Sequence, residues 1–87
     1  MWMALTPAAV QKIEHLIAER FLKLRKERGL TQEDFDQEPI GIPARTIQRL
    51  ESKDVTNLEL KTIIKLAFYL GIHPKDLLDV EVPWDKA

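Results

Sequence analysis

Cysteine is absent from this 87-residue sequence, and glycine is scarce, with only three residues. Without cysteine there is no disulfide framework and no thiolate ligand for a metal. No apolar run approaches the roughly 20 residues that a membrane-spanning helix needs, and the amino terminus does not show the pattern of a signal peptide. We therefore expect a protein of a reducing intracellular compartment with no membrane contact.

The chain also lacks an excess of one charge sign, since 13 basic residues face 14 acidic ones for a net charge of −1. This balance excludes a surface that attracts polyanions everywhere, so the distribution along the chain matters more. Basic residues gather at 20–28 and again at 45–53, whereas acidic residues gather at 33–38 and 76–85. Local basic faces are therefore compatible with a nearly neutral protein.

Sets of side chains that carry catalysis are missing too. The sequence has no glycine-rich phosphate loop, no Ser/His/Asp set and no cysteine nucleophile. Its two histidines, His15 and His73, fall in different expected elements, whereas metal sites need convergent ligands. We expect no enzyme activity, no metal and no cofactor, in one small domain that spans residues 1–87, with a core at 7–79 and a tail at 80–87.

What the sequence does contain is helical periodicity interrupted by prolines and glycines. Thr6 and the following proline start the first helix, Gly29 ends it, and Pro39 limits the second. Thr56 and Asn57 precede a fourth helix that is expected to be nearly all core. The five expected helices span residues 7–28, 32–38, 43–53, 58–70 and 75–79.

The third expected helix has two different faces. Ile47 and Leu50 fall on one side, which should pack against the rest of the protein. The opposite side is polar and carries Arg45, Gln48, Arg49 and Ser52. Two short helices around a glycine-containing turn, with an outward polar face on the second, are typical of a helix-turn-helix domain.

An ordered set of residues between 21 and 79 resembles the Cro/CI-type helix-turn-helix family, also called the XRE family. The matching residues are Leu24-Arg25, Gly29-Leu30-Thr31-Gln32, Phe35, Gly41-Ile42, Ile47, Leu50-Glu51, Leu66-Ala67, Leu70-Gly71-Ile72 and Asp76-Leu77-Leu78. The resemblance implies an all-α, five-helix, lambda-repressor-like bundle with a long first helix and a short C-terminal tail. It also implies a cytoplasmic protein of bacterial or phage type that binds double-stranded DNA as a homodimer, with no small-molecule effector.

The resemblance further implies roles for individual residues. The third helix would enter the major groove, where Arg45 and Arg49 could each bond bidentately to guanine and Ala44 could touch a thymine methyl. The residues implied to read bases are Ala44, Arg45, Gln48 and Arg49. Those implied to contact phosphates are Thr31, Gln32, Ser52 and Lys53. Arg25 and Glu51 are implied to form a structural ion pair between the first and third helices.

The sequence departs from the family pattern at three places. One extra residue stands near Pro39, the loop at 52–57 is one residue long, and Asp36 occupies a position where relatives tend to have alanine. A small side chain there lets the two helices approach, so a carboxylate must turn outward, find a partner or hold the helices apart. These departures leave the docking geometry of the third helix open.

We expect a sequence-specific transcriptional regulator, a dimeric repressor that reads a pseudo-palindromic operator. One alternative is the autoregulating controller of an antitoxin or restriction–modification locus, and another is a protein-interaction module that has kept the fold without DNA binding. Trp2, Trp84 and the pair Phe68-Tyr69 supply apolar surface near the termini and the fourth helix. They could dock onto their own domain or form the contact between two copies.

Overall fold

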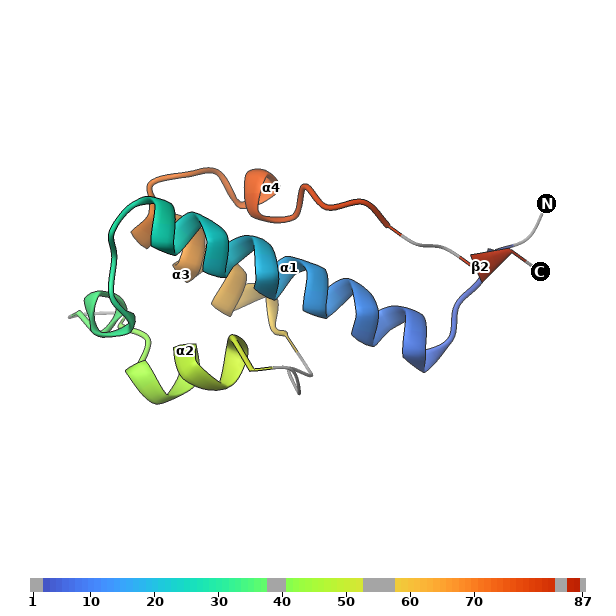
Figure 1. Ribbon diagram of the computed structural model, residues 1–87, viewed down its shortest axis with the longest axis horizontal. Helices are drawn as coiled ribbons and strands as arrows, with labels where there is room; N and C mark the ends of the chain where they lie inside the picture. The colour runs from blue at the N-terminus through green and yellow to red at the C-terminus, as the bar shows by residue number, and fades with distance from the viewer. Residues whose placement is uncertain (1–2, 38–40, 53–57, 83–84, 87) are drawn as a thin grey trace.

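The computed structural model of the chain describes residues 3–37, 41–52, 58–82 and 85–86. Its elements, in order, are β1 (Met3–Ala4), α1 (Pro7–Glu27), the 3₁₀ helix η1 (Gln32–Phe35), α2 (Ala44–Leu50), α3 (Leu60–Leu70), α4 (Pro74–Leu77) and β2 (Asp85–Lys86), as Figure 1 shows. The helical class is confirmed. The count of five helices is not confirmed, because the described part of the chain holds four α-helices and one short 3₁₀ helix.

Helix α1 begins where its end signals predict and ends at Glu27, one residue before the expected end, with Arg28 as its C-cap. The hydroxyl of Thr6 accepts a hydrogen bond from the backbone N–H of Ala9 at 3.0 Å, and proline occupies the first turn. At the other end Gly29 has a φ of +66°, a left-handed conformation that glycine adopts without steric cost. The backbone N–H of Leu30 then bonds back to the carbonyl of Arg25 at 3.1 Å. This hydrogen-bonded turn ends α1 and leads directly to η1.

Element η1 is shorter than the expected helix at 32–38, and that expectation is wrong in its length. The backbone N–H of Asp36 bonds to the carbonyl of Glu33 at 3.0 Å, a 3₁₀ bond, and Asp36 itself leaves helical geometry with φ −95° and ψ +71°. The side-chain amide of Gln37 donates to the carbonyl of Asp34 at 2.9 Å. The side chain of Gln37 therefore occupies the carbonyl of Asp34, which would accept a backbone N–H if the helix continued as an α-helix.

The turn between η1 and α2 brings two backbone segments into close approach at Gly41. A Cβ atom built on Gly41 would lie 2.6 Å from the backbone nitrogen of Gln37 and 2.8 Å from its carbonyl oxygen. Since the obstructing atoms are backbone, they cannot move aside as a flexible side chain could. Immediately after the glycine, the N–H of Ile42 donates to the carbonyl of Phe35 at 2.7 Å, which fixes the chain as it enters α2.

We predict that Gly41→Ala lowers the free energy of unfolding by about 1–3 kcal/mol, because the added methyl group forces the η1–α2 turn apart. Urea unfolding followed by circular dichroism measures this loss. Gly29→Asn is the matched control, since asparagine tolerates a left-handed φ and a Cβ at position 29 meets nothing within 4 Å. Equal losses in the two variants would contradict the steric argument.

Helices α3 and α4 differ from their expected bounds by a few residues. Glu59 is the N-cap of α3, so the helix begins later than predicted, and Thr56 and Asn57 lie outside the described residues. Gly71, with φ +73°, ends α3 where the sequence places its end. His73 is the N-cap of α4 but makes no capping bond with its side chain, and α4 spans Pro74–Leu77 where residues 75–79 were expected. Proline itself fills the first helical position, which moves the start forward.

The core lies where α1, η1, α2, α3 and α4 meet. Three of its members are aromatic and pack edge to face: the ring centroids of Phe21 and Phe35 are 5.3 Å apart, and those of Phe35 and Tyr69 are 5.8 Å apart. The side chains with almost no solvent exposure are Phe21, Phe35, Ile47, Leu66 and Leu77. Arg20 of α1 adds a polar tie, since its Nε donates to the carbonyl of Asp76 in α4 at 2.5 Å.

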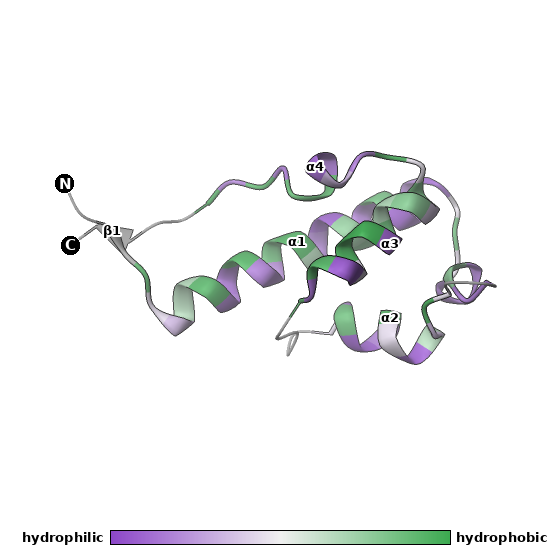
Figure 2. Ribbon diagram, turned by 180° about the vertical axis from the view of Figure 1, so that it is seen from behind, coloured by the Kyte–Doolittle hydropathy of each residue, from purple (hydrophilic) through white to green (hydrophobic). Residues whose placement is uncertain are grey.

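The expectation that the helix at 58–70 is nearly all core is wrong for one of its faces. Ile63, Leu66, Ala67 and Leu70 are buried. Leu60, Ile64 and Phe68, however, expose 65%, 50% and 75% of their surface. In Figure 2, which views the molecule from behind, α3 lies in front of α1 and is hydrophobic over much of its length. It therefore presents apolar side chains to solvent as well as to the core.

The molecule is elongated, with principal extents of 46 × 22 × 21 Å. The first turns of α1 and the two short strands stand away from the bundle (Figure 1). There β1 and β2 pair antiparallel, with Met3 opposite Lys86 and Ala4 opposite Asp85, so residues 85–86 lie beside residues 3–4. Trp2 and Trp84 lie outside the described residues. Among the described helices, none is long and apolar enough to cross a membrane.

Candidate nucleic-acid interface

Helix α2 and η1 lie next to each other on one side of α1, and α4 lies on the other side (Figure 1). The link between η1 and α2 is anchored at both ends by buried apolar residues, Phe35 at 0% exposure and Ile42 at 3%. The backbone hydrogen bond between these two anchors, from the N–H of Ile42 to the carbonyl of Phe35, fixes where α2 starts relative to η1. The pair forms a helix-turn-helix unit whose second member is at the surface.

The two faces of α2 follow the periodicity of the sequence. Ile47 is fully buried and Leu50 is 5% exposed, so this side of the helix belongs to the core. Ala44, in the first turn, is half-buried. The exposed residues of the helix and its C-terminal turn are Arg45, Thr46, Gln48, Arg49 and Ser52. Core packing therefore holds the helix by one side while a row of hydrogen-bonding side chains faces solvent.

Arg45 and Arg49 stand one helical turn apart on this outward face. Within residues 3–37, 41–52, 58–82 and 85–86, no carboxylate forms an ion pair with either guanidinium. Each guanidinium carries five N–H donors in a planar fork, a shape that suits two adjacent acceptors. The pair can therefore bind a ligand without first breaking an ion pair to the described part of the chain.

A bidentate ion pair joins the end of α1 to the end of α2. Nε of Arg25 lies 2.6 Å from Oε2 of Glu51, and its Nη2 lies 3.0 Å from Oε1. The two side chains are only 11% and 9% exposed, so water screens the pair weakly. Nη1 of Arg25 also donates to the carbonyl of Leu30 at 2.9 Å. One guanidinium therefore connects α1, the turn before η1 and the C-cap of α2.

Gln32 takes a place in this network that the sequence does not reveal. Its Nε2 donates to Oε1 of Glu51 at 3.0 Å, so the first residue of η1 is bound to the residue that caps α2. The family resemblance implies a phosphate contact for Gln32, and no local pattern in the sequence signals its bond across 19 residues to Glu51. Its amide keeps a second N–H donor for another partner.

The remaining residues assigned to phosphates are placed near the same network or outside the described chain. Thr31 is exposed beside Gln32, and its backbone N–H donates to Oδ2 of Asp34 at 2.6 Å, which completes one half of the expected capping box. Ser52 follows Glu51, is exposed, and donates its hydroxyl to the carbonyl of Arg49 at 2.6 Å. Lys53 lies outside the described residues. Thr31, Gln32 and Ser52 thus gather around the C-terminal end of α2.

Of the three arrangements that the sequence left open for the carboxylate of Asp36, the structure has the outward-facing one. Its side chain is exposed at the end of η1, so the carboxylate turns outward and is not buried between the helices. A hollow of about 400 Å³ beside η1 is lined by Leu30, Asp34, Phe35, Gln37, Phe68 and Tyr69. It lies between η1 and α3 and is not part of the outward face of α2.

Comparison with known proteins bears on this geometry. No curated protein and no solved structure matches the chain. The family model described as the Cro/C1-type HTH DNA-binding domain does match, at residues 12–83, a span that contains η1, α2, the ion pair and the outward arginines. The chain therefore belongs to the family of Cro/C1-type helix-turn-helix DNA-binding domains.

Proposed function

We propose that this protein is a sequence-specific transcriptional regulator, a dimeric repressor that inserts α2 into the major groove of a pseudo-palindromic operator. The observation that carries the proposal is the exposed row on α2, where Arg45 and Arg49 have no ion-pair partner in the described chain. On the opposite side of the same helix, Ile47 and Leu50 are buried in the core. A rigid helix with free guanidinium groups is the arrangement that direct reading of base edges requires.

Each of the base-reading residues has its own role in this proposal. Arg45 and Arg49 bond to the O6 and N7 acceptors of guanine, a bidentate contact that only the major groove offers. Gln48, on the same exposed face, can pair with adenine, and Ala44 can make an apolar contact with a thymine methyl. Repression follows when the bound protein occupies a promoter, in the cytoplasm of a bacterial or phage-type host.

Phosphate contacts would come from Thr31, Gln32, Ser52 and Lys53, which fix the position of the protein and carry no sequence information. The first three gather at one end of α2, at the other end from Arg45. Each neutralised phosphate contributes about −0.9 to the slope of log affinity against log salt concentration. The four side chains include only one cation, so we expect a modest slope from this group.

A protein-interaction module is the second candidate function. The observation that favours it is the exposed apolar face of α3, formed by Leu60, Ile64 and Phe68, together with a net charge of −1. The two functions are separable, because DNA reading requires the face of α2 and protein binding requires the face of α3. An autoregulating controller of an antitoxin or restriction–modification locus is a subtype of the first function and uses the same α2 face.

Selection of duplexes from a random DNA pool by the purified protein tests the proposal directly. We expect enrichment of an inverted repeat whose half-sites are about one helical turn apart, because a two-fold dimer places two reading helices at that spacing. The selection is run at two salt concentrations to separate specific from non-specific binding. A folded protein that enriches no sequence at either concentration would refute DNA reading and favour the interaction module.

A further inference from the structure

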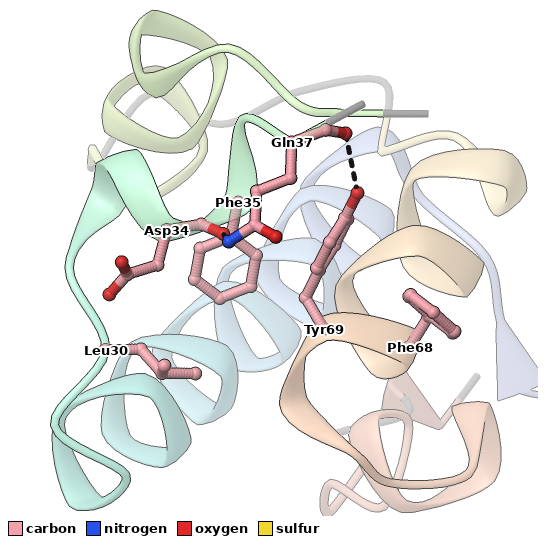
Figure 3. Close-up of a pocket in the computed structure, with 6 residues that line it drawn as sticks. All are labelled: Leu30, Asp34, Phe35, Gln37, Phe68 and Tyr69. Atoms are coloured by element: carbon pink, nitrogen blue, oxygen red, sulfur yellow. Dashed lines mark hydrogen bonds between the residues drawn. The ribbon is translucent and has the colours of Figure 1, made fainter. Parts of the chain in front are cut away.

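The hydroxyl group of Tyr69 connects α3 to the end of η1. It donates a hydrogen bond to the backbone carbonyl of Gln37 at 3.0 Å, and Figure 3 shows the side chain of Tyr69 pointing from α3 toward this oxygen, beside the ring of Phe35. A hollow of about 400 Å³ lies between the two elements here, so they are not packed closely at this place. The side chain of Tyr69 therefore provides a direct link between α3 and a residue just after η1.

The carbonyl that accepts this bond belongs to the same peptide group against which Gly41 packs. A Cβ atom on Gly41 would lie 2.8 Å from the oxygen of Gln37. The next residue, Ile42, donates its N–H to the carbonyl of Phe35 at 2.7 Å. Tyr69 therefore holds one side of the turn, and the backbone of Gly41 and Ile42 closes on the other side, immediately before α2 begins.

We propose that Tyr69 is a positioning residue for DNA recognition, because its hydroxyl fixes the turn between η1 and α2 and thereby the first turn of α2, where Arg45 stands. The inference rests on the proposed function for its link to DNA. Tyr69 acts through Gln37 and not by contact with DNA. Helix α2 is then held at both ends, at its start by the turn and at its C-cap by the Arg25–Glu51 pair.

The length of the turn explains why it needs this hydrogen bond. The sequence carries one more residue near Pro39 than the pattern of its family, and a longer connection has more backbone conformations to restrict. The ring of Tyr69 packs against Phe35 with centroids 5.8 Å apart, a contact that phenylalanine would also make. The hydroxyl supplies what the ring cannot, and Tyr69→Phe separates the two contributions.

A purely structural role for the hydroxyl is the rival explanation, and Thr6→Val is the matched control for it. The hydroxyl of Thr6 also makes one hydrogen bond of 3.0 Å, to the backbone N–H of Ala9, at the start of α1 and away from the bundle (Figure 1). Both variants remove a hydroxyl and keep the shape of the side chain. Both should lower Tm slightly, but only Tyr69→Phe should change how DNA is read.

Binding to single-substitution duplexes tests this difference. Fluorescence anisotropy is measured with the selected duplex and with duplexes that each carry one changed base pair. We expect Tyr69→Phe to reduce the preference by about two- to fivefold, the effect of one hydrogen bond, at the base pair that Arg45→Ala identifies. The preference identified by Arg49→Ala should change less, because Arg49 stands beside the C-terminal end that the ion pair holds. Thr6→Val should leave both preferences unchanged.

Amide hydrogen exchange measures the turn itself in the absence of DNA. In Tyr69→Phe, the amide hydrogen of Ile42 should exchange about two- to fivefold faster than in the original protein, because the turn opens more often. The amide hydrogen of Leu30 is the internal reference, since it bonds to the carbonyl of Arg25 at 3.1 Å outside this turn. Its exchange rate should stay the same.

The two measurements together decide the proposal. An equal loss of preference at every base pair, or the same loss in Thr6→Val, would overturn it, because global stability would then explain the effect. Unchanged preference in Tyr69→Phe would also overturn it, whatever the exchange rate of Ile42, because the turn would not set the position of α2. A protein that selects no DNA refutes the regulator. In that case faster exchange confined to Ile42 supports the role of the hydroxyl in the turn, and unchanged exchange overturns it.

Discussion

Replacing Arg45 and Arg49 together by alanine is expected to abolish the sequence preference of the protein while leaving its fold intact. Each bidentate arginine–guanine contact contributes about 1–3 kcal/mol of discrimination. Losing both should weaken binding to the preferred site by roughly 30-fold to 10⁴-fold. Binding to unrelated DNA should weaken far less, because that binding depends on phosphates. Fluorescence anisotropy with the selected duplex and a scrambled one measures both effects.

The matched control for this prediction removes the same charge elsewhere. Lys12 in α1 and Lys75 in α4 are both exposed, and α4 lies on the other side of α1 from α2. The variant Lys12→Ala/Lys75→Ala should keep the sequence preference and lose only a small, sequence-independent part of the affinity. If it lost as much preference as the arginine variant, net charge and not direct reading would explain the binding.

Glu51→Ala is expected to lower the free energy of unfolding by about 3 kcal/mol, because it leaves the guanidinium of Arg25 largely buried without its counter-charge. Arg25 would keep the carbonyl of Leu30 as a partner, and Gln32 would lose its acceptor on Glu51. In a domain of this size the loss corresponds to a fall of roughly 12–24 °C in Tm. Differential scanning calorimetry measures it.

Two further variants test whether charge or packing is responsible. Glu51→Gln keeps the shape and one acceptor oxygen, so we expect a smaller loss than with alanine. The double variant Arg25→Met/Glu51→Leu removes both charges and fills the space. Its loss of unfolding free energy should be smaller than the sum of the losses of Arg25→Met and Glu51→Leu measured singly. Additive losses would mean that the two side chains, 2.6 Å apart, act independently, contrary to the structure.

Residues whose effect is local made much of the fold predictable. Thr6 starts α1 because its hydroxyl accepts from a free N–H in the first turn, and the proline after it has no N–H that needs a partner. Gly29 and Gly71 end helices because they adopt positive φ. The burial of Ile47 and Leu50 follows from helical periodicity alone. The outward face of α2, with its two arginines, follows from the same periodicity.

Features that depend on individual side-chain hydrogen bonds, on close packing or on contacts distant in the sequence were not predictable. Element η1 ends early because the side chain of Gln37 takes the carbonyl of Asp34 and Gly41 packs against the backbone of Gln37. The bond from Gln32 to Glu51 spans 19 residues. The exposure of Ile64 also depends on which neighbours reach α3, and an apolar residue in a helix looks the same in sequence whether it faces its own core or solvent.

The place of the Arg25–Glu51 pair has a mechanical consequence for recognition. The pair holds α2 at its C-terminal end, while Arg45 stands six residues away, about 9 Å along the helix axis. A tilt of roughly 10° about Glu51 would therefore swing the first turn by about 1.5 Å, half the length of a hydrogen bond. A small change in angle at Glu51 therefore moves the first turn of α2 by a larger distance. Substitutions around Glu51 should reduce the sequence preference for DNA before they unfold the protein.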